Sequence, residues 1–304
     1  MNRFWSGQGP LVLAFLFAFI SSSSNNKAVA FHNVVTGTGA LEVQLITAKL
    51  ALKAGDSCSI ICQTDSNFVK KCIALMYGED AGRNYDSEAY AKREMPQFVS
   101  SGDAIENALT KADNVIVVCE EKGVDNDYFD TLLSTSPNLK HVALLSRQGG
   151  KLKSMENYIR EKCAKLSASN GQDISLSIIR AGTLVGGGPG DVDRNDGEEW
   201  GLSKYFYDTK YDLSDAMITM AFDKFTVGAK VAHGDPFKGP NFISKMMSNN
   251  SFEPRDVDTG RTAAAQALLA AVRRVGRGVD ISISTGKATT PPSPEVWDSL
   301  LEQK

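Results

Sequence analysis

Short runs rich in Val, Ile and Leu alternate along the chain with longer stretches that have the composition and spacing of helices. The apolar runs are continuous, as expected for strands whose two faces are both covered by helices. They lie at residues 33–37, 57–63, 96–103, 114–120, 139–147, 174–182 and 280–286. Helices are expected at 40–55, from Ala104, and at 154–169, 259–275 and 293–303, with Asp258 or Thr259 as the cap of the helix at 259–275.

Strands that alternate with helices imply right-handed βαβ units and a parallel sheet. A doubly wound open sheet in a single α/β domain, residues 31–304, is therefore the predicted fold. The alternation breaks near Gly186, where a loop-forming stretch of glycine and acidic residues begins. Because strand and helix signals resume later, residues 186 to about 255 are interpreted as an insertion that forms a lid or substrate lobe.

The composition narrows the range of functions. With 304 residues, a net charge of −3 and scattered Lys and Arg, the chain gives no electrostatic reason to expect nucleic acid as a partner. The cysteines number five, and their spacings match no metal knuckle, so no metal site is predicted. Buried free thiols are the preferred interpretation, and they favour a reducing compartment.

The first thirty residues have the layout of a secretory signal peptide. A single Arg3 precedes the apolar run 11–20, which is too short to span a bilayer, and an Ala-x-Ala step ends at Ala30. The "AVAF" step also resembles the plastid-targeting motif of algae with complex plastids, in which a transit peptide begins at a phenylalanine, here Phe31. This resemblance implies a plastid location and no membrane span in the mature chain; the secretory pathway is the alternative.

The stretch "VVTGTGALE" joins the first strand to the first helix through Gly37, Thr38 and Gly39. Glycines at such a turn allow a tight bend and a close approach of pyrophosphate to the helix N-terminus. Glu42 stands near the place of a third glycine. Its carboxylate would repel pyrophosphate if it faced the turn, or would be favourable if it turned outward on the first turn of the helix.

The order of these segments resembles the short-chain dehydrogenase/reductase superfamily, especially its atypical and extended branches, over most of residues 33–304. The motifs that carry the resemblance are "VVTGTGALE", "SSGDAIENALTKADNVIVV", "HVALLS", "YIREK" and "IIRAGTLVGGGPG". The resemblance implies a Rossmann-like fold that binds NADP or NAD. The cofactor-binding residues that it implies are Gly37, Thr38, Gly39, Gln63, Asp103, Lys162, Gly182 and Thr183.

The same resemblance implies a catalytic set of Ser146, Tyr158 and Lys162. Tyr158 and Lys162 are four residues apart, so a helix would place both on one face. In such a site the tyrosine transfers a proton, the lysine favours the phenolate and binds the nicotinamide ribose, and the serine orients the substrate carbonyl. The competing interpretation is that Tyr158 and Lys162 lie on a solvated helix face and that Ser146 only ends a strand.

Two functions of different class follow. The leading hypothesis is an NAD(P)-binding reductase or dehydrogenase that acts on a small organic substrate. The alternative is a non-catalytic scaffold or assembly factor of the plastid with the same fold, and a sugar-nucleotide epimerase-like enzyme is a weaker third possibility. The aromatic stretch that starts at Trp200 either lines an apolar pocket or belongs to the core. The oligomeric state stays open.

The targeting interpretation predicts that residues 1–30 direct a fluorescent fusion into the secretory route and, in an alga with complex plastids, onward into the plastid. Replacing Phe31 by alanine in a longer fusion should stop the protein before it enters the plastid. Fluorescence microscopy checks both outcomes, and a fusion that stays wholly in the cytosol would eliminate the interpretation.

Overall fold

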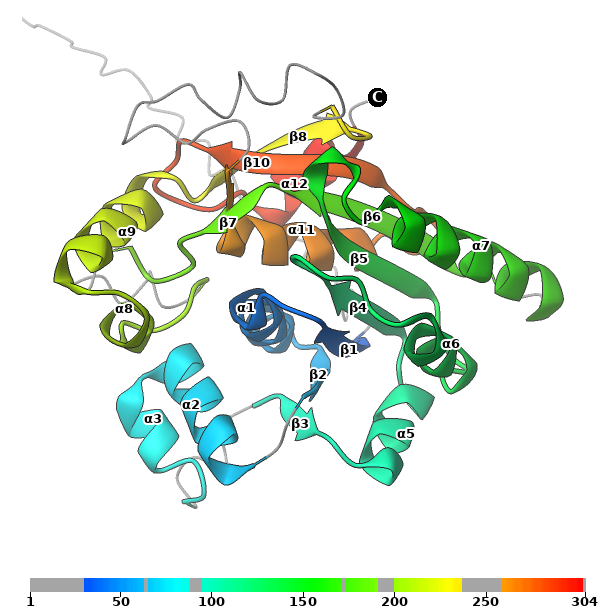
Figure 1. Cartoon of the computed structure of the whole chain (residues 1–304), viewed down its shortest axis with the longest axis horizontal. Coiled ribbons are helices and arrows are strands. Elements are labelled where there is room, and N and C mark those ends of the chain that lie inside the picture. The colour runs from blue at the N-terminus through cyan, green and yellow to red at the C-terminus, as the bar shows by residue number, and fades with distance from the viewer. Residues whose placement is uncertain are drawn as a thin grey trace, which may run out of the picture.

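The structure is a computed structural model that describes residues 30–62, 65–87, 95–170, 173–190, 200–236 and 258–302. The described chain forms an eight-stranded sheet in the order β3-β2-β1-β4-β5-β6-β10-β8 (Figure 1). Its strands are β1 (His32–Gly37), β2 (Ser57–Ile61), β3 (Gln97–Val99), β4 (Asn114–Val118), β5 (His141–Arg147), β6 (Ser175–Ala181), β8 (Gly228–His233) and β10 (Asp280–Gly286). The order 3-2-1-4-5-6 is that of a doubly wound, Rossmann-type sheet, so the predicted fold is confirmed.

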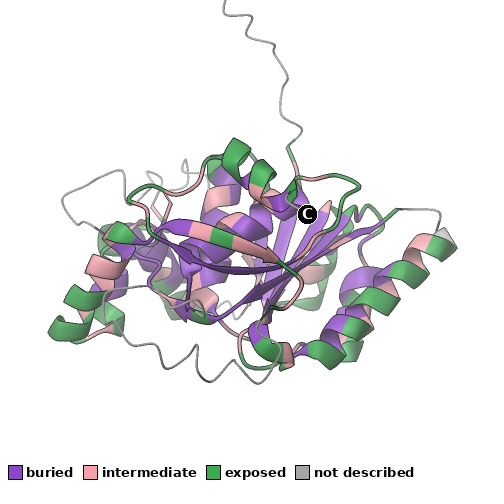
Figure 2. Cartoon of the chain, turned by 90° about the horizontal axis from the view of Figure 1, so that it is seen from above, coloured by how far each residue is buried: buried purple, intermediate pink, exposed green. Residues whose placement is uncertain are grey.

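Helices cover both faces of this sheet. On one face lie α1 (Leu41–Lys53) and α11 (Arg261–Val272), which pack against each other, and on the other lie α5 (Gly102–Thr110), α6 (Asn126–Ser134) and α7 (Lys153–Asn170) (Figure 1). Val34 and Val35 of β1 are both fully buried, and they belong to the two different cores. The central strands are thus apolar on both sides, which explains their continuous runs of Val, Ile and Leu (Figure 2).

Three further helices extend the first of these layers. They are α2 (Ser66–Tyr77), α3 (Glu79–Arg83) and the C-terminal α12 (Pro294–Glu302). The side chain of Asp65 caps α2 by accepting a hydrogen bond of 2.9 Å from the Phe68 amide. Among the described helices, none is long and apolar enough to cross a membrane. Four cysteines, Cys58, Cys72, Cys119 and Cys163, are buried with free thiols, as expected.

The segment interpreted as an insertion is divided between two places. Its helices α8 (Tyr205–Lys210) and α9 (Leu213–Phe225) stand beside the sheet, whereas β8 pairs antiparallel with β10 and forms an edge of the main sheet. Residues 191–199 and 237–257 lie outside the described chain. Residues 228–233, which the sequence analysis included in the insertion, thus form β8 and complete the main sheet.

A small second sheet lies next to the carboxyl end of β6. It pairs β7 (Thr183–Val185) with β9 (Asp258–Gly260) in parallel. Asp258 and Thr259 are thus strand residues, and the N-cap of α11 is Gly260 without a side-chain cap. The predicted cap is wrong because the Thr259 hydroxyl bonds elsewhere, to the Ile283 carbonyl at 2.9 Å.

The end of β1 depends on the absence of a side chain at Gly37. A Cβ atom placed there would lie 1.8 Å from the Val118 carbonyl oxygen of β4. We predict that Gly37→Ala lowers the free energy of unfolding by ~3 kcal/mol or more, because the backbone of β4 cannot move aside. Chemical denaturation measures the loss. Gly102→Ala is the control, since a Cβ there meets no atom within 4 Å, and an equal loss in both variants would contradict the prediction.

Candidate functional site

The turn between β1 and α1 lies at the carboxyl edge of the sheet, where ligands bind in doubly wound folds. Gly37, Thr38 and Gly39 form it as the sequence predicted, and the Thr38 amide donates to the Val118 carbonyl at 3.1 Å. This bond pins the turn against β4. The next residue, Ala40, is the N-cap of α1 and has a left-handed backbone with a φ of 43°. Its carbonyl accepts from the Val43 amide at 2.9 Å. The turn therefore lies where a doubly wound fold places its phosphate loop.

A carboxylate of the same chain occupies the mouth of this turn. Glu120, which follows β4, accepts a hydrogen bond of 3.2 Å from the Ala40 amide through Oε2. A Cβ added to Gly39 would lie 3.1 Å from the Glu120 Cβ atom, and the Thr38 hydroxyl donates to the Lys122 carbonyl. The segment after β4 thus closes over the turn, and its carboxylate lies where helix N-termini attract anions.

Glu42 faces away from this mouth. Its carboxylate forms an ion pair with Lys210 of α8 and lies 3.9 Å from the Arg261 guanidinium. These two cations lower the pKa of Glu42 although partial burial opposes the shift. Of the two orientations left open by the sequence, the structure has the outward one, in which Glu42 joins α1 to α8 and α11.

Ser146 ends β5 at the same edge, but its hydroxyl is turned inward. It donates to Glu156 of α7 at 2.6 Å, and the Ser146 residue is only 1% exposed. Glu156 is paired in turn with Arg180 of β6 at 2.7 Å, and Arg180 also reaches Asp280 of β10. The serine thus belongs to a buried ionic network that ties α7 to three strands.

Tyr158 and Lys162 share a different partner. The Tyr158 hydroxyl donates to Asp130 of α6 at 2.8 Å, and the Lys162 ammonium reaches the other oxygen of the same carboxylate at 2.5 Å. Burial and the hydrogen bond to the Asp130 carboxylate raise the pKa of Tyr158, and the same carboxylate raises the pKa of Lys162. A catalytic tyrosine needs the opposite shift. The pair therefore joins two helices of one layer.

The structure brings Tyr158 and Lys162 together, but it does not bring Ser146 to them. Glu156 and Tyr158 are two positions apart in α7, which corresponds to about 200° around a helix. With Glu156 directed to Ser146 and the sheet, Tyr158 is directed to α6 instead. In this arrangement Ser146 is bonded to Glu156, whereas Tyr158 and Lys162 share Asp130.

The remaining predicted cofactor residues are spread along the carboxyl edge. Gly182 follows β6, where its amide donates to the Thr259 hydroxyl at 2.9 Å and its carbonyl accepts from Arg147 at 2.9 Å. Thr183 begins β7 and is exposed, and Asp103 is exposed in the first turn of α5. Gln63 lies outside the described residues.

A second glycine turn carries a buried network that the sequence analysis did not assign. Asp223 of α9 accepts bonds from the Gly187 and Gly188 amides at 2.8 and 3.0 Å, and from the Tyr207 hydroxyl at 2.7 Å. Burial raises the pKa of Asp223 from 3.8 to about 6, against the opposing effect of these donors. The sequence "GGG" could have indicated this network, because successive backbone amides can form a concave binding site for an anion.

Phe206 and Tyr207 are fully buried, so this part of the aromatic stretch belongs to the core.

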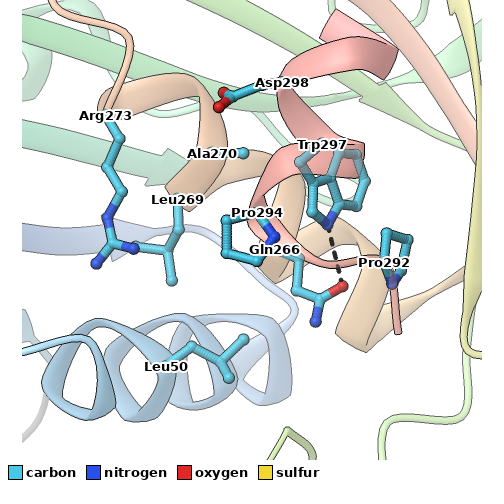
Figure 3. A pocket seen from close by; sticks show the side chains of 9 residues that line it. All are labelled: Leu50, Gln266, Leu269, Ala270, Arg273, Pro292, Pro294, Trp297 and Asp298. Atoms are coloured by element: carbon cyan, nitrogen blue, oxygen red, sulfur yellow. Dashed lines mark hydrogen bonds between the residues drawn. The ribbon is translucent and has the colours of Figure 1, made fainter. Parts of the chain in front are cut away.

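A cavity of about 300 Å³ lies away from the glycine turn, between α1, α11 and α12 (Figure 3). Leu50, in the last turn of α1, forms one wall, and Trp297 forms another and donates to the Gln266 amide oxygen at 3.3 Å. Arg273 at its rim pairs with Asp56, which immediately precedes β2. The cavity therefore belongs to the amino-terminal edge of the sheet, and it is separate from the β1–α1 turn.

Similarity to known proteins is found among solved structures alone. No protein-family model and no curated protein matches the sequence. Among solved structures, the chain is similar to UDP-N-acetylglucosamine 4-epimerase from Bacillus cereus, with 10% identity, a TM-score of 0.43 and coverage of 88% of this chain and 82% of that one. It is similar to a reductase engineered for asymmetric catalysis, with 11% identity, a TM-score of 0.42 and coverage of 85% and 80%.

A third similarity is to a short-chain dehydrogenase/reductase from Serratia marcescens, with 8% identity, a TM-score of 0.32 and coverage of 51% of this chain and 76% of that one. The fold assignment itself rests on the strand order of this chain. In the described part of the chain, no group of three or more His, Cys, Asp or Glu side chains could hold a metal ion.

The Asp223 network predicts a pH dependence with a defined sign. Because the folded-state pKa is raised, the contribution of Asp223 to stability is present below pH 3.8 and is lost as the pH rises through about 6. The free energy of unfolding of the wild type, minus that of Asp223→Asn, should therefore fall across this interval. Urea unfolding at several pH values measures it. The exposed Asp215 provides the control variant Asp215→Asn, and a difference that grows with pH would contradict the prediction.

Proposed function

We propose that the protein binds NAD or NADP across the carboxyl edge of its sheet. The observation that carries this proposal is the Rossmann strand order together with a β1–α1 turn in which Gly37 admits no side chain. The turn fits a pyrophosphate only in part. The Gly39 and Ala40 amides lie at the N-terminus of α1, where an anion would bind, but Glu120 holds the Ala40 amide and must move for an anion to enter.

The residues that would hold the cofactor follow from this geometry. The amides of Gly39 and Ala40 would bind the pyrophosphate, and the carboxyl ends of β5 and β6 would face the nicotinamide half. Asp103 stands at the end of the outer strand β3, on the adenosine side. When bound, a nicotinamide supplies hydride transfer. An oxidoreductase that acts on a small organic substrate is therefore the activity proposed.

Proton transfer in such a reaction cannot use Tyr158 as it stands, because that hydroxyl is bound to Asp130. The catalytic assignment of Ser146, Tyr158 and Lys162 thus requires a rearrangement of α7 that also frees Ser146 from Glu156. The need for this rearrangement supports a second candidate function, that of a non-catalytic scaffold with the same fold. The location proposed for either function is the plastid, on the strength of the "AVAF" step alone.

The closed turn predicts how the affinity for the dinucleotide responds to Glu120. Glu120→Ala removes a carboxylate that competes for the same amide, so the affinity for NADH or NADPH should rise by about tenfold. Titration of residues 31–304 with each nucleotide, followed by fluorescence, measures it. Adding Gly39→Asp to this variant should abolish the gain, because it restores a negative charge at the turn.

Glu121→Gln is the matched control, since Glu121 is the exposed neighbour of Glu120. Its affinity should equal that of the wild type. If neither the wild type nor Glu120→Ala binds either nucleotide at millimolar concentration, the dinucleotide proposal fails and the scaffold becomes the better account. If both bind equally, the cofactor proposal stands and the competing role of Glu120 fails.

A further inference from the structure

Phe31 is held at the amino edge of the sheet by contacts of its amide, its carbonyl and its ring. Its amide donates to Asp56 Oδ1 at 3.1 Å, and its carbonyl accepts a bond of 2.9 Å from the Ser57 amide. The Lys140 ammonium lies 5.8 Å from the centre of its ring. Ala30, by contrast, is exposed and makes no hydrogen bond within the described chain. The ordered contacts of the fold thus begin at the nitrogen of Phe31.

The sequence places a processing signal at the same boundary. The Ala-x-Ala step ends at Ala30, after an apolar run and a serine-rich stretch. A signal peptidase cleaves after such a step. Its hydrolysis breaks the bond between the Ala30 carbonyl carbon and the Phe31 nitrogen, and water supplies a hydroxyl to the carbon and a hydrogen to the nitrogen. The freed amine takes up one more proton near neutral pH.

We propose that cleavage between Ala30 and Phe31 creates the mature N-terminus, and that Asp56 is the binding site for the α-ammonium group that the cleavage releases. The nitrogen that donates to Asp56 as an amide is the atom that becomes charged. It needs no displacement to form a charge-assisted hydrogen bond, which is about twice as strong as a neutral one.

The surroundings of this nitrogen are electrostatically suited to a cation. Asp56 is 7% exposed, its other oxygen pairs with Arg273 at 2.8 Å, and the Asn33 amide lies at 3.4 Å. The next amide, that of His32, donates to Asp113 at 2.9 Å, and Asp113 also pairs with Lys140. Lys111 is close enough to His32 to lower its pKa, after burial. The two carboxylates already have cationic partners, Arg273 and Lys140, so the direct hydrogen bond to Asp56 Oδ1, rather than a net negative charge, is what would hold the ammonium.

The new charge gives the stability of the mature protein a pH dependence. A free α-amine has a pKa of about 7.7, and the Asp56 carboxylate holds the folded value higher. The stabilisation is fully present below the unfolded value and is lost as the pH rises through the folded one. A chain that starts one residue earlier keeps the Phe31 amide but carries its charge elsewhere, so it lacks this dependence.

The test compares chains that start at Phe31 or at Ala30, each released from a ubiquitin fusion so that no residue is added. At pH 6–7 the Phe31 chain should unfold at a temperature about 2–4 °C higher, and the difference should vanish above pH 10. Asp56→Asn should remove the difference. Equal midpoints in the wild-type background, or a difference that persists with Asp56→Asn, would overturn the binding site.

Two further measurements test the proposal if the Asp56→Asn variant does not fold. The rate of acylation of the terminal amine, measured against pH, should give a higher pKa for the Phe31 chain than for the Ala30 chain, and an equal or lower value would count against the site. Translation of the full chain with microsomal membranes, followed by mass spectrometry, should yield a product that begins at Phe31. A different start, or no cleavage, would overturn the processing step.

Discussion

The buried guanidinium of Arg180 sets the arrangement of the carboxyl half of the sheet. A charge that is only 5% exposed must be paired, and Arg180 draws Glu156 from α7 and Asp280 from β10 toward β6. Glu156 then takes the Ser146 hydroxyl. This pairing fixes the rotation of α7 about its axis, so Tyr158 and Lys162 meet α6. The same interaction that stabilises the packing of α7 therefore decides which side chains can reach a bound cofactor.

The carboxyl and amino edges of the sheet carry different structural features. The carboxyl edge carries the glycine turn, the ends of β5 and β6, and the small sheet β7–β9, and the proposed cofactor would cross it. The amino edge carries Asp56, its partner Arg273 and the cavity beside Trp297. The contacts of Phe31 and the glycine turn at Gly37 thus lie at opposite ends of the single strand β1, and changes at one edge need not disturb the other.

Much of the fold could be predicted from the sequence because the central strands are buried on both faces. Their continuous apolar runs gave the order and approximate bounds of β1, β2, β4, β5, β6 and β10. The edge strand β8 was missed, since five of its six residues are only partly buried or exposed and it lacks such a run. Gly37 and Gly39 were correctly placed at the β1–α1 turn. The orientation of Ser146, however, depends on its bond to Glu156, which is paired with Arg180. These residues are far apart in the sequence, so a local sequence pattern could not predict their pairing.

The contact between Glu120 and the Ala40 amide makes the turn selective among anions. A tethered carboxylate competes as a ligand at a constant effective concentration, roughly millimolar or above for a short connection. Chloride or acetate, which offer one charge and no other contact, cannot outcompete it at ordinary concentrations. The proposed dinucleotide could, because its two nucleosides would bind elsewhere along the edge and contribute their own free energy. The turn would therefore bind only ligands that also contact the protein at a second site. Simple inorganic anions would not bind, and no separate lid would be needed to exclude them.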